Sequence, residues 1–349
     1  MSAISGEMSR NARSFKILEA VVDEYIRTGE PIGSKLLAGK LDFDVSPATI
    51  RNEMAFLEVG GYLEQPHTSA GRVPTVKGYR TYIERFMPLP RAELSDEDRL
   101  IIDSAVETIC GDGGTDELII ENASHALAEL TKCAVVSSNK VNRFSVISKV
   151  DVIPTGRRVY MLLLVTSCGG VKNRVCRLSF DLNEEQLAFF TAFANENLSG
   201  MNIENLSQEY IDEIGVALGS YMVSLSPLLK AVADLSGELA EGHVNFEGES
   251  NLVAFEDLQK GEIQRILENR GAFTDLLETA FSEVSVILND ETALISNAGL
   301  IAGSFHKHGK NAGSFGVIGP MRLDYKKLIP FVDYFAAEVT KLLSRDGES

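Results

Sequence analysis

Hydrophobic side chains recur at helical spacing near the start of the chain. From Arg13 to Arg27 a 3.6-residue period predicts an amphipathic helix, which ends at Gly29-Glu30-Pro31. A short second helix is expected from about residue 34 to 40. A third should follow Ser46-Pro47, because serine supplies an acceptor for unpaired N–H groups at a helix start and proline lacks such a group.

The third helix has two different sides. Ile50, Met54 and Leu57 share one side and are expected to pack inward. The opposite side is small and polar, and it carries Ala48, Asn52 and Ala55, flanked by Thr49 and Arg51. Small residues allow close approach to base edges, and Asn and Arg match adenine and guanine in the major groove of DNA. This pattern is typical of a recognition helix.

A basic segment follows. From Gln65 to Tyr82 the chain carries Arg72, Lys77 and Arg80 and no acidic residue, with the hydrogen-bond donors His67, Thr68 and Ser69 beside them. Positive charge and such donors suit contacts to phosphate. Three helices followed by a loop of this kind give the order of a winged helix-turn-helix. The alternative is a helical hairpin with a polar loop, since helix-turn-helix spacing is weakly specific.

The remaining chain alternates between sheet and helix patterns. Met87-Pro88-Leu89-Pro90 predicts a short stiff linker. Helices are expected at 95–109, 115–130, 183–197, 207–223, 226–241, 257–269 and 325–343, and strands at 145–152, 158–166, 170–180, 284–288, 300–305 and 314–318. Pro154-Thr155-Gly156 and residues 167–170 read as hairpin connections, which predicts an antiparallel sheet flanked by helices. The helical block between two sheet-forming halves predicts an inserted domain, to which residues 243–255 add a strand or two.

Composition limits the possible classes. A chain of 349 residues is expected to form two or three domains. No hydrophobic run approaches the ~20 residues that cross a bilayer, and residues 1–13 lack the apolar core of a signal peptide. The four cysteines show no paired metal spacing. We therefore expect a cytoplasmic protein with no membrane partner.

The net charge of −17 is unevenly distributed. Residues 10–87 hold 11 Lys or Arg and 10 Asp or Glu, a balance of +1, whereas residues 88–349 hold 22 and 39, a balance of −17, and Glu7 supplies the last −1. Such a chain is expected to bind nucleic acid through a small basic footprint, with its acidic bulk held away from phosphate.

A search for reactive chemistry favours no enzyme. His306 and His308 could ligate a metal, but no Cys or second His cluster completes a site. The glycines at 309, 313, 316 and 319 do not form a dinucleotide fingerprint, which must follow a strand and open a helix. Asp290-Glu291 reads as ordinary acidic surface, and Cys168 has no histidine close in sequence. We expect no catalytic residue, no metal and no cofactor.

Three segments resemble the heat-inducible transcription repressor family HrcA of bacteria. They are Gly29-Glu30-Pro31-Ile32-Gly33-Ser34-Lys35, residues 46–54 and residues 66–75, and residues 316–325 resemble the same family's C-terminal signature. The resemblance implies an α+β multidomain protein with a winged helix-turn-helix at 1–88. It further implies a GAF-like antiparallel sheet domain at 89–181 and 262–349, interrupted by a mainly helical dimerisation domain at 182–261.

The resemblance also implies a function. Members of the family repress chaperonin and Hsp70-system genes by binding an inverted-repeat operator in double-stranded DNA, and they depend on the GroE chaperonin. The residues expected to bind DNA are Ser46, Ala48, Thr49, Arg51, Asn52, His67, Thr68, Ser69, Arg72, Lys77 and Arg80.

A homodimer is expected, because a single winged helix offers DNA an interface of only roughly 600–1,000 Å². The helices of the insert carry more apolar side chains than one helix face requires, and part of this surplus is expected to contact the second subunit. These side chains are Leu187, Phe189, Phe190, Phe193, Tyr210, Ile211 and Ile214.

Two other functions remain open. A regulator could sense a small molecule through the GAF-like sheet, which would require a lined pocket. An enzyme of the cyclic-nucleotide or hydrolase type could use the same sheet, but it should show a catalytic constellation.

Overall fold

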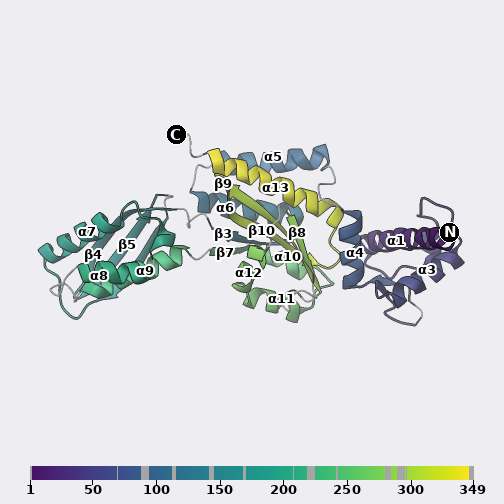
Figure 1. Ribbon diagram of the computed structural model, residues 1–349, viewed down its shortest axis with the longest axis horizontal. Helices are drawn as coiled ribbons and strands as arrows, with labels where there is room; N and C mark the ends of the chain where they lie inside the picture. Colours follow the sequence, from purple (N-terminus) through teal and green to yellow (C-terminus); the bar gives the residue numbers. More distant parts are fainter. Residues whose placement is uncertain are drawn as a thin grey trace.

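The computed structural model describes residues 2–68, 70–87, 94–111, 115–140, 145–167, 170–206, 208–217, 225–240, 243–279, 284–288, 295 and 297–345. They form a mixed α+β structure of three units in a row (Figure 1). We call residues 2–87 the N-terminal unit, residues 94–140 with 243–345 the central unit, and residues 145–240 the inserted unit.

The N-terminal unit contains four helices and a short hairpin. The helices are α1 (Ser2–Thr28), α2 (Ser34–Ala38), α3 (Pro47–Val59) and α4 (Val76–Phe86), and the strands are β1 (Leu63–Glu64) and β2 (Val73–Pro74). The predicted helices are confirmed, although α1 begins well before Arg13. Gly29, with a φ of 70°, ends the turn after α1 in a backbone region that favours glycine. Leu18, Ile50 and Leu57 are fully buried in the core of the unit.

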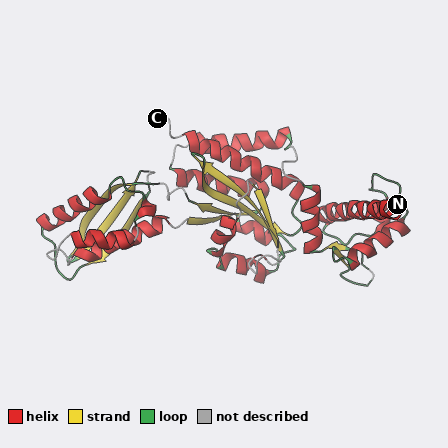
Figure 2. Ribbon diagram, viewed as in Figure 1, coloured by secondary structure: helices red, strands yellow, loops and turns green. Residues whose placement is uncertain are grey.

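The central unit is built on a five-stranded antiparallel sheet in the order β7-β3-β10-β9-β8. Its strands are β3 (Ala134–Asn139), β7 (His243–Glu247), β8 (Val284–Leu288), β9 (Ala298–Lys307) and β10 (Lys310–Pro320). Helices α5 (Asp96–Gly111), α6 (Asp116–Thr131) and α13 (Tyr325–Arg345) cover one face, and α10 (Glu249–Ala254), α11 (Lys260–Glu268) and α12 (Ala272–Thr279) lie on the other (Figures 1 and 2).

The inserted unit has its own sheet and its own core. Strands β4 (Ile147–Gly156), β5 (Val159–Thr166) and β6 (Val171–Arg177) pair only with one another among the described strands. Helices α7 (Glu184–Leu198), α8 (Gln208–Ala217) and α9 (Ser226–Ala240), with the short helix η2 (Ile203–Asn205), complete the unit. Along β5 buried and half-buried side chains alternate, as expected for a sheet that helices cover on one face.

The strand pairing corrects the expected domain boundaries. The strands of residues 145–180 were assigned to the sheet of the flanking segments, with the insert at 182–261. They instead form the first half of the insert, while β7 and the helices after it belong to the central unit. Consecutive strands joined by short connections usually pair with each other. Strands β4, β5 and β6 therefore form a separate three-stranded sheet. The sheet position that these strands were expected to fill is taken by β3, which the sequence analysis missed.

Two smaller expectations also change. Pro154-Thr155-Gly156 lies within β4, and the chain turns instead at Arg157 and Arg158, where Arg158 has a φ of 59°. The expected linker lies largely outside the described residues, since only Met87 of that segment is placed. Among the described residues, no helix has the length and apolar character needed to cross a membrane.

Candidate nucleic-acid interface

Helix α3 begins as its sequence predicts. The Ser46 Oγ accepts a hydrogen bond from the Thr49 N–H at 3.2 Å, and Pro47 is the first helical residue. This cap pairs one of the N–H groups that a helix start leaves open, and it fixes where the helix begins. The predicted roles of Ser46 and Pro47 in starting the helix are confirmed.

One side of α3 is fixed by packing and by a buried charge. Ile50, Met54 and Leu57 are buried, as predicted. Glu53 is buried as well, and its carboxylate accepts hydrogen bonds from the Arg13 guanidinium and the Ser14 hydroxyl of α1. A buried carboxylate needs such partners to offset its lost hydration. Sequence patterns do not predict this contact, because residues 13 and 53 are far apart in the chain.

The other side of α3 is open to solvent. Ala48, Arg51, Asn52 and Ala55 are exposed, and Thr49 is half-buried. Within the described part of the chain, the expected base-reading side is therefore left uncovered. Phe56 and Val59 are also exposed near the end of the helix.

The loop between β1 and β2 is held in shape from within. The Gln65 side-chain amide donates to the carbonyl oxygens of Thr68 and Ala70, at 3.1 and 2.9 Å. A Cβ on Gly71 would lie 2.4 Å from the Ile32 backbone, so only glycine allows the paired hydrogen bonds between Ile32 and Arg72. His67 and Thr68 are exposed on this loop, and Ser69 lies outside the described residues.

The predicted phosphate-binding cations fall into two groups. The Arg72 guanidinium pairs with the Glu58 carboxylate of α3 at 2.8 Å, and only about a fifth of its side chain is exposed. The Lys77 ammonium donates to the Gly60 carbonyl at 2.8 Å and lies over the Tyr62 ring. Arg80 is half-buried and has interactions within the protein. Arg72 and Lys77 thus brace the hairpin, and Lys77, like Arg51, is exposed.

A hollow of about 460 Å³ separates α2, α3 and the hairpin loop. Lys35 and Arg51 line it from two helices, and Gln65 and Thr68 line it from the loop. Lys35 is exposed, and the sequence analysis left it out of the site. Its position at the start of the second helix, in the Gly33-Ser34-Lys35 segment, was the available signal. Two cations beside one hollow suit a phosphate backbone.

One buried acid holds the C-terminal end of α1 to the residues that follow α2. Glu24 accepts hydrogen bonds from Arg27 and Lys40. The hydrogen bond from Arg27 has the largest effect on the pKa of Glu24, and that from Lys40 the next largest. Together they lower this pKa from 4.5 to about 2. The carboxylate is therefore charged over the whole physiological pH range, and it keeps its contact with Lys40 throughout that range.

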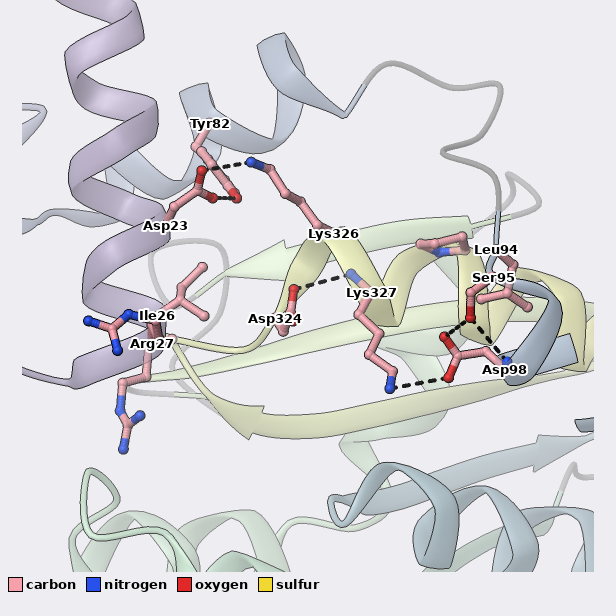
Figure 3. A pocket seen from close by; sticks show the side chains of 12 residues that line it. Asp23, Ile26, Arg27, Tyr82, Leu94, Ser95, Asp98, Asp324, Lys326 and Lys327 are labelled. Atoms are coloured by element: carbon pink, nitrogen blue, oxygen red, sulfur yellow. Dashed lines mark hydrogen bonds and ion pairs between the residues drawn. The ribbon is translucent and has the colours of Figure 1, made fainter. Parts of the chain in front are cut away.

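The N-terminal unit is seated on the central unit across a polar cavity of about 800 Å³ (Figure 3). The Lys326 ammonium of α13 contacts Asp23 of α1 at 2.7 Å, and Asp23 also accepts from the Tyr82 hydroxyl of α4. Farther along the cavity, Lys327 contacts Asp98 at 3.2 Å (Figure 3). The orientation of the exposed side of α3 is therefore set by side chains of the central unit.

Comparison with known proteins identifies the family. Residues 117–329 match the model of the HrcA protein C terminal domain. The heat-inducible transcription repressor HrcA of Acetivibrio thermocellus is 30% identical over 347 residues, which cover 97% of each chain. That of Clostridium perfringens is 32% identical over 343 residues, which cover 95% of this chain and 98% of the relative.

A solved structure agrees over nearly the whole length. The crystal structure of a hypothetical protein is similar with a TM-score of 0.64 and 26% identity, over 95% of this chain and 98% of that one. The chain therefore belongs to the HrcA family of heat-inducible transcription repressors, a family of negative transcriptional regulators and not of enzymes.

Proposed function

We propose that this protein represses transcription by binding an inverted-repeat operator in double-stranded DNA through its N-terminal unit. The observation that supports this proposal most directly is the exposed side of α3, which carries Ala48, Arg51 and Asn52. This side lies beside a hairpin that Arg72 holds to Glu58 of α3. The element order α1-α2-α3-β1-β2 and the Ile32–Arg72 bridge support a winged helix-turn-helix. In this arrangement α3 enters the major groove and the hairpin loop follows the adjacent backbone.

The contacts divide by chemistry. Asn52 and Arg51, with Thr49 beside them, would contact base edges, and Ala48 would allow close approach. Lys35, His67, Thr68 and Ser69 would contact phosphate. Arg72, Lys77 and Arg80 would act mainly by holding the hairpin, since each has contacts within the protein.

We propose that two chains form a homodimer through the inserted unit. Ile153, Met161 and Val175 are cross-strand neighbours on the sheet face that α7, α8 and α9 do not cover. Val175 is 63% exposed, and Val171 on the same strand is 54% exposed. By contrast, Phe190, Ile211 and Ile214, which were expected to supply surplus apolar surface, are buried in the unit's own core. An exposed apolar sheet face of this kind favours a self-complementary contact.

The dimer is tested by the mass of the full chain in solution. Val175→Arg should convert dimer to monomer in light scattering, because it places a charge on the apolar face. Val253→Arg is the matched control, since Val253 is 71% exposed in the central unit. A Val175→Arg variant that remains dimeric would reject this face as the interface.

The proposed targets are chaperonin and Hsp70-system genes in the cytoplasm, with the GroE chaperonin as a partner. The insertion supports chaperonin dependence, because the central sheet closes only when β3 meets β7 and β10 from distant segments. Such non-local pairing folds slowly and leaves apolar strands open meanwhile. The central domain would be GAF-like, a five-stranded antiparallel sheet with helices on both faces.

Two measurements test this function. Footprinting of purified protein on genomic fragments should protect an inverted repeat upstream of chaperone genes, and protection of unrelated sites alone would contradict the proposal. Refolding with chaperonin and ATP should raise the yield of operator-binding protein several-fold. Equal yields with and without chaperonin would contradict the proposed dependence on the chaperonin.

A further inference from the structure

The central unit contains a cavity of about 420 Å³ close to the N-terminal unit. The start of α5, the end of α6 and the segment leading into α13 enclose it. Its apolar wall includes Ile101, Leu130, Cys133, Phe255, Leu323 and Phe331. Cavities of this size, with mainly apolar walls and a few polar groups, are typical of small-molecule sites.

Three basic and two acidic side chains line the cavity. Arg322, Lys327 and Lys132 line it, together with the acids Asp98 and Asp324. Arg322 is paired with Asp257 at 2.7 Å and Lys327 with Asp98 at 3.2 Å. Lys132 is exposed, and no ion pair to it is found among the described residues. One cation at the rim is thus open to an anion.

We propose that this cavity binds one amphiphilic anion, a medium-chain fatty carboxylate. Its hydrocarbon chain would lie against the apolar wall, and its carboxylate would contact the Lys132 ammonium. Burial of the chain supplies the driving force, and the charged pair at the rim sets the orientation. A neutral alcohol with a hydrocarbon chain of equal length would lack the charged pair with Lys132.

The site also lies next to the seat of the N-terminal unit. Arg322 and Lys327 line both this cavity and the larger one between the units. The Arg322 guanidinium lies against Gly29, the residue after α1, where a Cβ would be 3.4 Å away. A ligand that fills the cavity would lie against Arg322, shift its guanidinium from Gly29 and so weaken the contact between the two units. The consequence, weaker operator binding, rests on the proposed DNA-binding function, whereas ligand binding itself does not.

Titration calorimetry of the full chain with decanoate, below its micelle concentration, tests the site. One saturable site per chain is expected. Lys132→Asn should weaken binding about tenfold, because one charge-assisted contact is lost. Asparagine is chosen because Lys132 has a φ of 55°, which asparagine tolerates. Decanol should bind the wild-type chain as weakly as decanoate binds this variant.

A matched pair of variants locates the site. Ile101→Glu places an acid in the cavity wall and should abolish binding, whereas Leu118→Glu should not change it. Both side chains are 41% exposed, but only Ile101 lines the cavity. No saturable binding by the wild-type chain, or equal binding by both variants, would overturn the site. If decanoate binds as expected but operator affinity in a gel shift is unchanged, the coupling to DNA is wrong and the site stands.

Discussion

Tyr79 of α4 and Tyr325 of α13 contact each other across the boundary between the N-terminal and central units. Their ring centroids are 6.0 Å apart, and both side chains are buried. Burial raises the pKa of both phenols, so both are neutral at physiological pH. The Tyr325 hydroxyl donates to the Met321 carbonyl at 2.8 Å, whereas the Tyr79 hydroxyl is buried with no hydrogen-bond partner among the described residues.

Removing the two hydroxyls should therefore have different effects on stability. Tyr325→Phe loses a hydrogen bond and should lower the free energy of unfolding by about 0.5–1.5 kcal/mol. Tyr79→Phe removes an unpaired buried hydroxyl and should leave that free energy unchanged or raise it. Urea unfolding of both variants checks this. A loss for Tyr79→Phe as large as that for Tyr325→Phe would show that the Tyr79 hydroxyl has a partner.

The two groups of cations in the N-terminal unit should respond differently to mutation. Lys35→Ala should reduce the salt dependence of operator binding by about one unit of slope, because it removes one of the proposed phosphate contacts. Arg72→Ala should instead lower the melting temperature, because it breaks the contact with Glu58 that ties the hairpin to α3. Gel shifts over a salt series and thermal melts separate these effects. An Arg72→Ala chain with unaltered stability and a reduced salt slope would reverse the assignment.

The inserted unit should be removable. Asn139 and His243 are cross-strand partners on β3 and β7, so the chain leaves and re-enters the central unit at the same place. Replacing residues 141–242 by a short Gly/Ser turn of about 2–5 residues should keep the other two units folded. The product should be a monomer by light scattering, with weaker operator binding. A dimeric product would place the interface elsewhere.

Acid should weaken the N-terminal unit through Glu24. Its pKa is about 2 in the folded chain and 4.5 ordinarily, so its contribution to stability is present above pH 4.5 and is lost as pH falls toward 2. Glu24→Gln should therefore destabilise the protein at pH 7. Its stability should also fall less than that of the wild-type chain between pH 4.5 and 2. Urea midpoints at several pH values test this. Parallel declines for the two proteins would assign the acid sensitivity to other groups.

Local sequence patterns predicted the N-terminal unit well. The Ser46-Pro47 start of α3, its buried side and its exposed side follow from helix capping and a 3.6-residue period, which depend on neighbouring residues only. The partners of Glu53 and Arg72 did not follow, because both contacts join side chains on different elements.

Strand pairing was the weakest part of the sequence analysis. Residues 145–180 were recognised as three strands, but a pattern of alternation does not say with which strands they pair. Strand β3 was missed because its Ala-Val-Val-Ser-Ser-Asn sequence is buried on both faces and so shows no alternation. These two errors together moved the expected boundary of the insert.

The account depends most on the exposed side of α3, and Asn52→Ala tests it most directly. Asn52 is exposed, so its replacement should not change stability, while loss of a base contact should cost roughly 1–3 kcal/mol of operator affinity. Asn311→Ala serves as the control, because Asn311 is an exposed asparagine of the central unit.

The measurement is operator affinity and sequence preference of Asn52→Ala, Asn311→Ala and the wild-type chain, at one fixed salt concentration. The account predicts weaker binding and relaxed preference at one base pair of each half-site for Asn52→Ala alone. Unchanged affinity and preference for Asn52→Ala would contradict the proposed orientation of α3 on DNA.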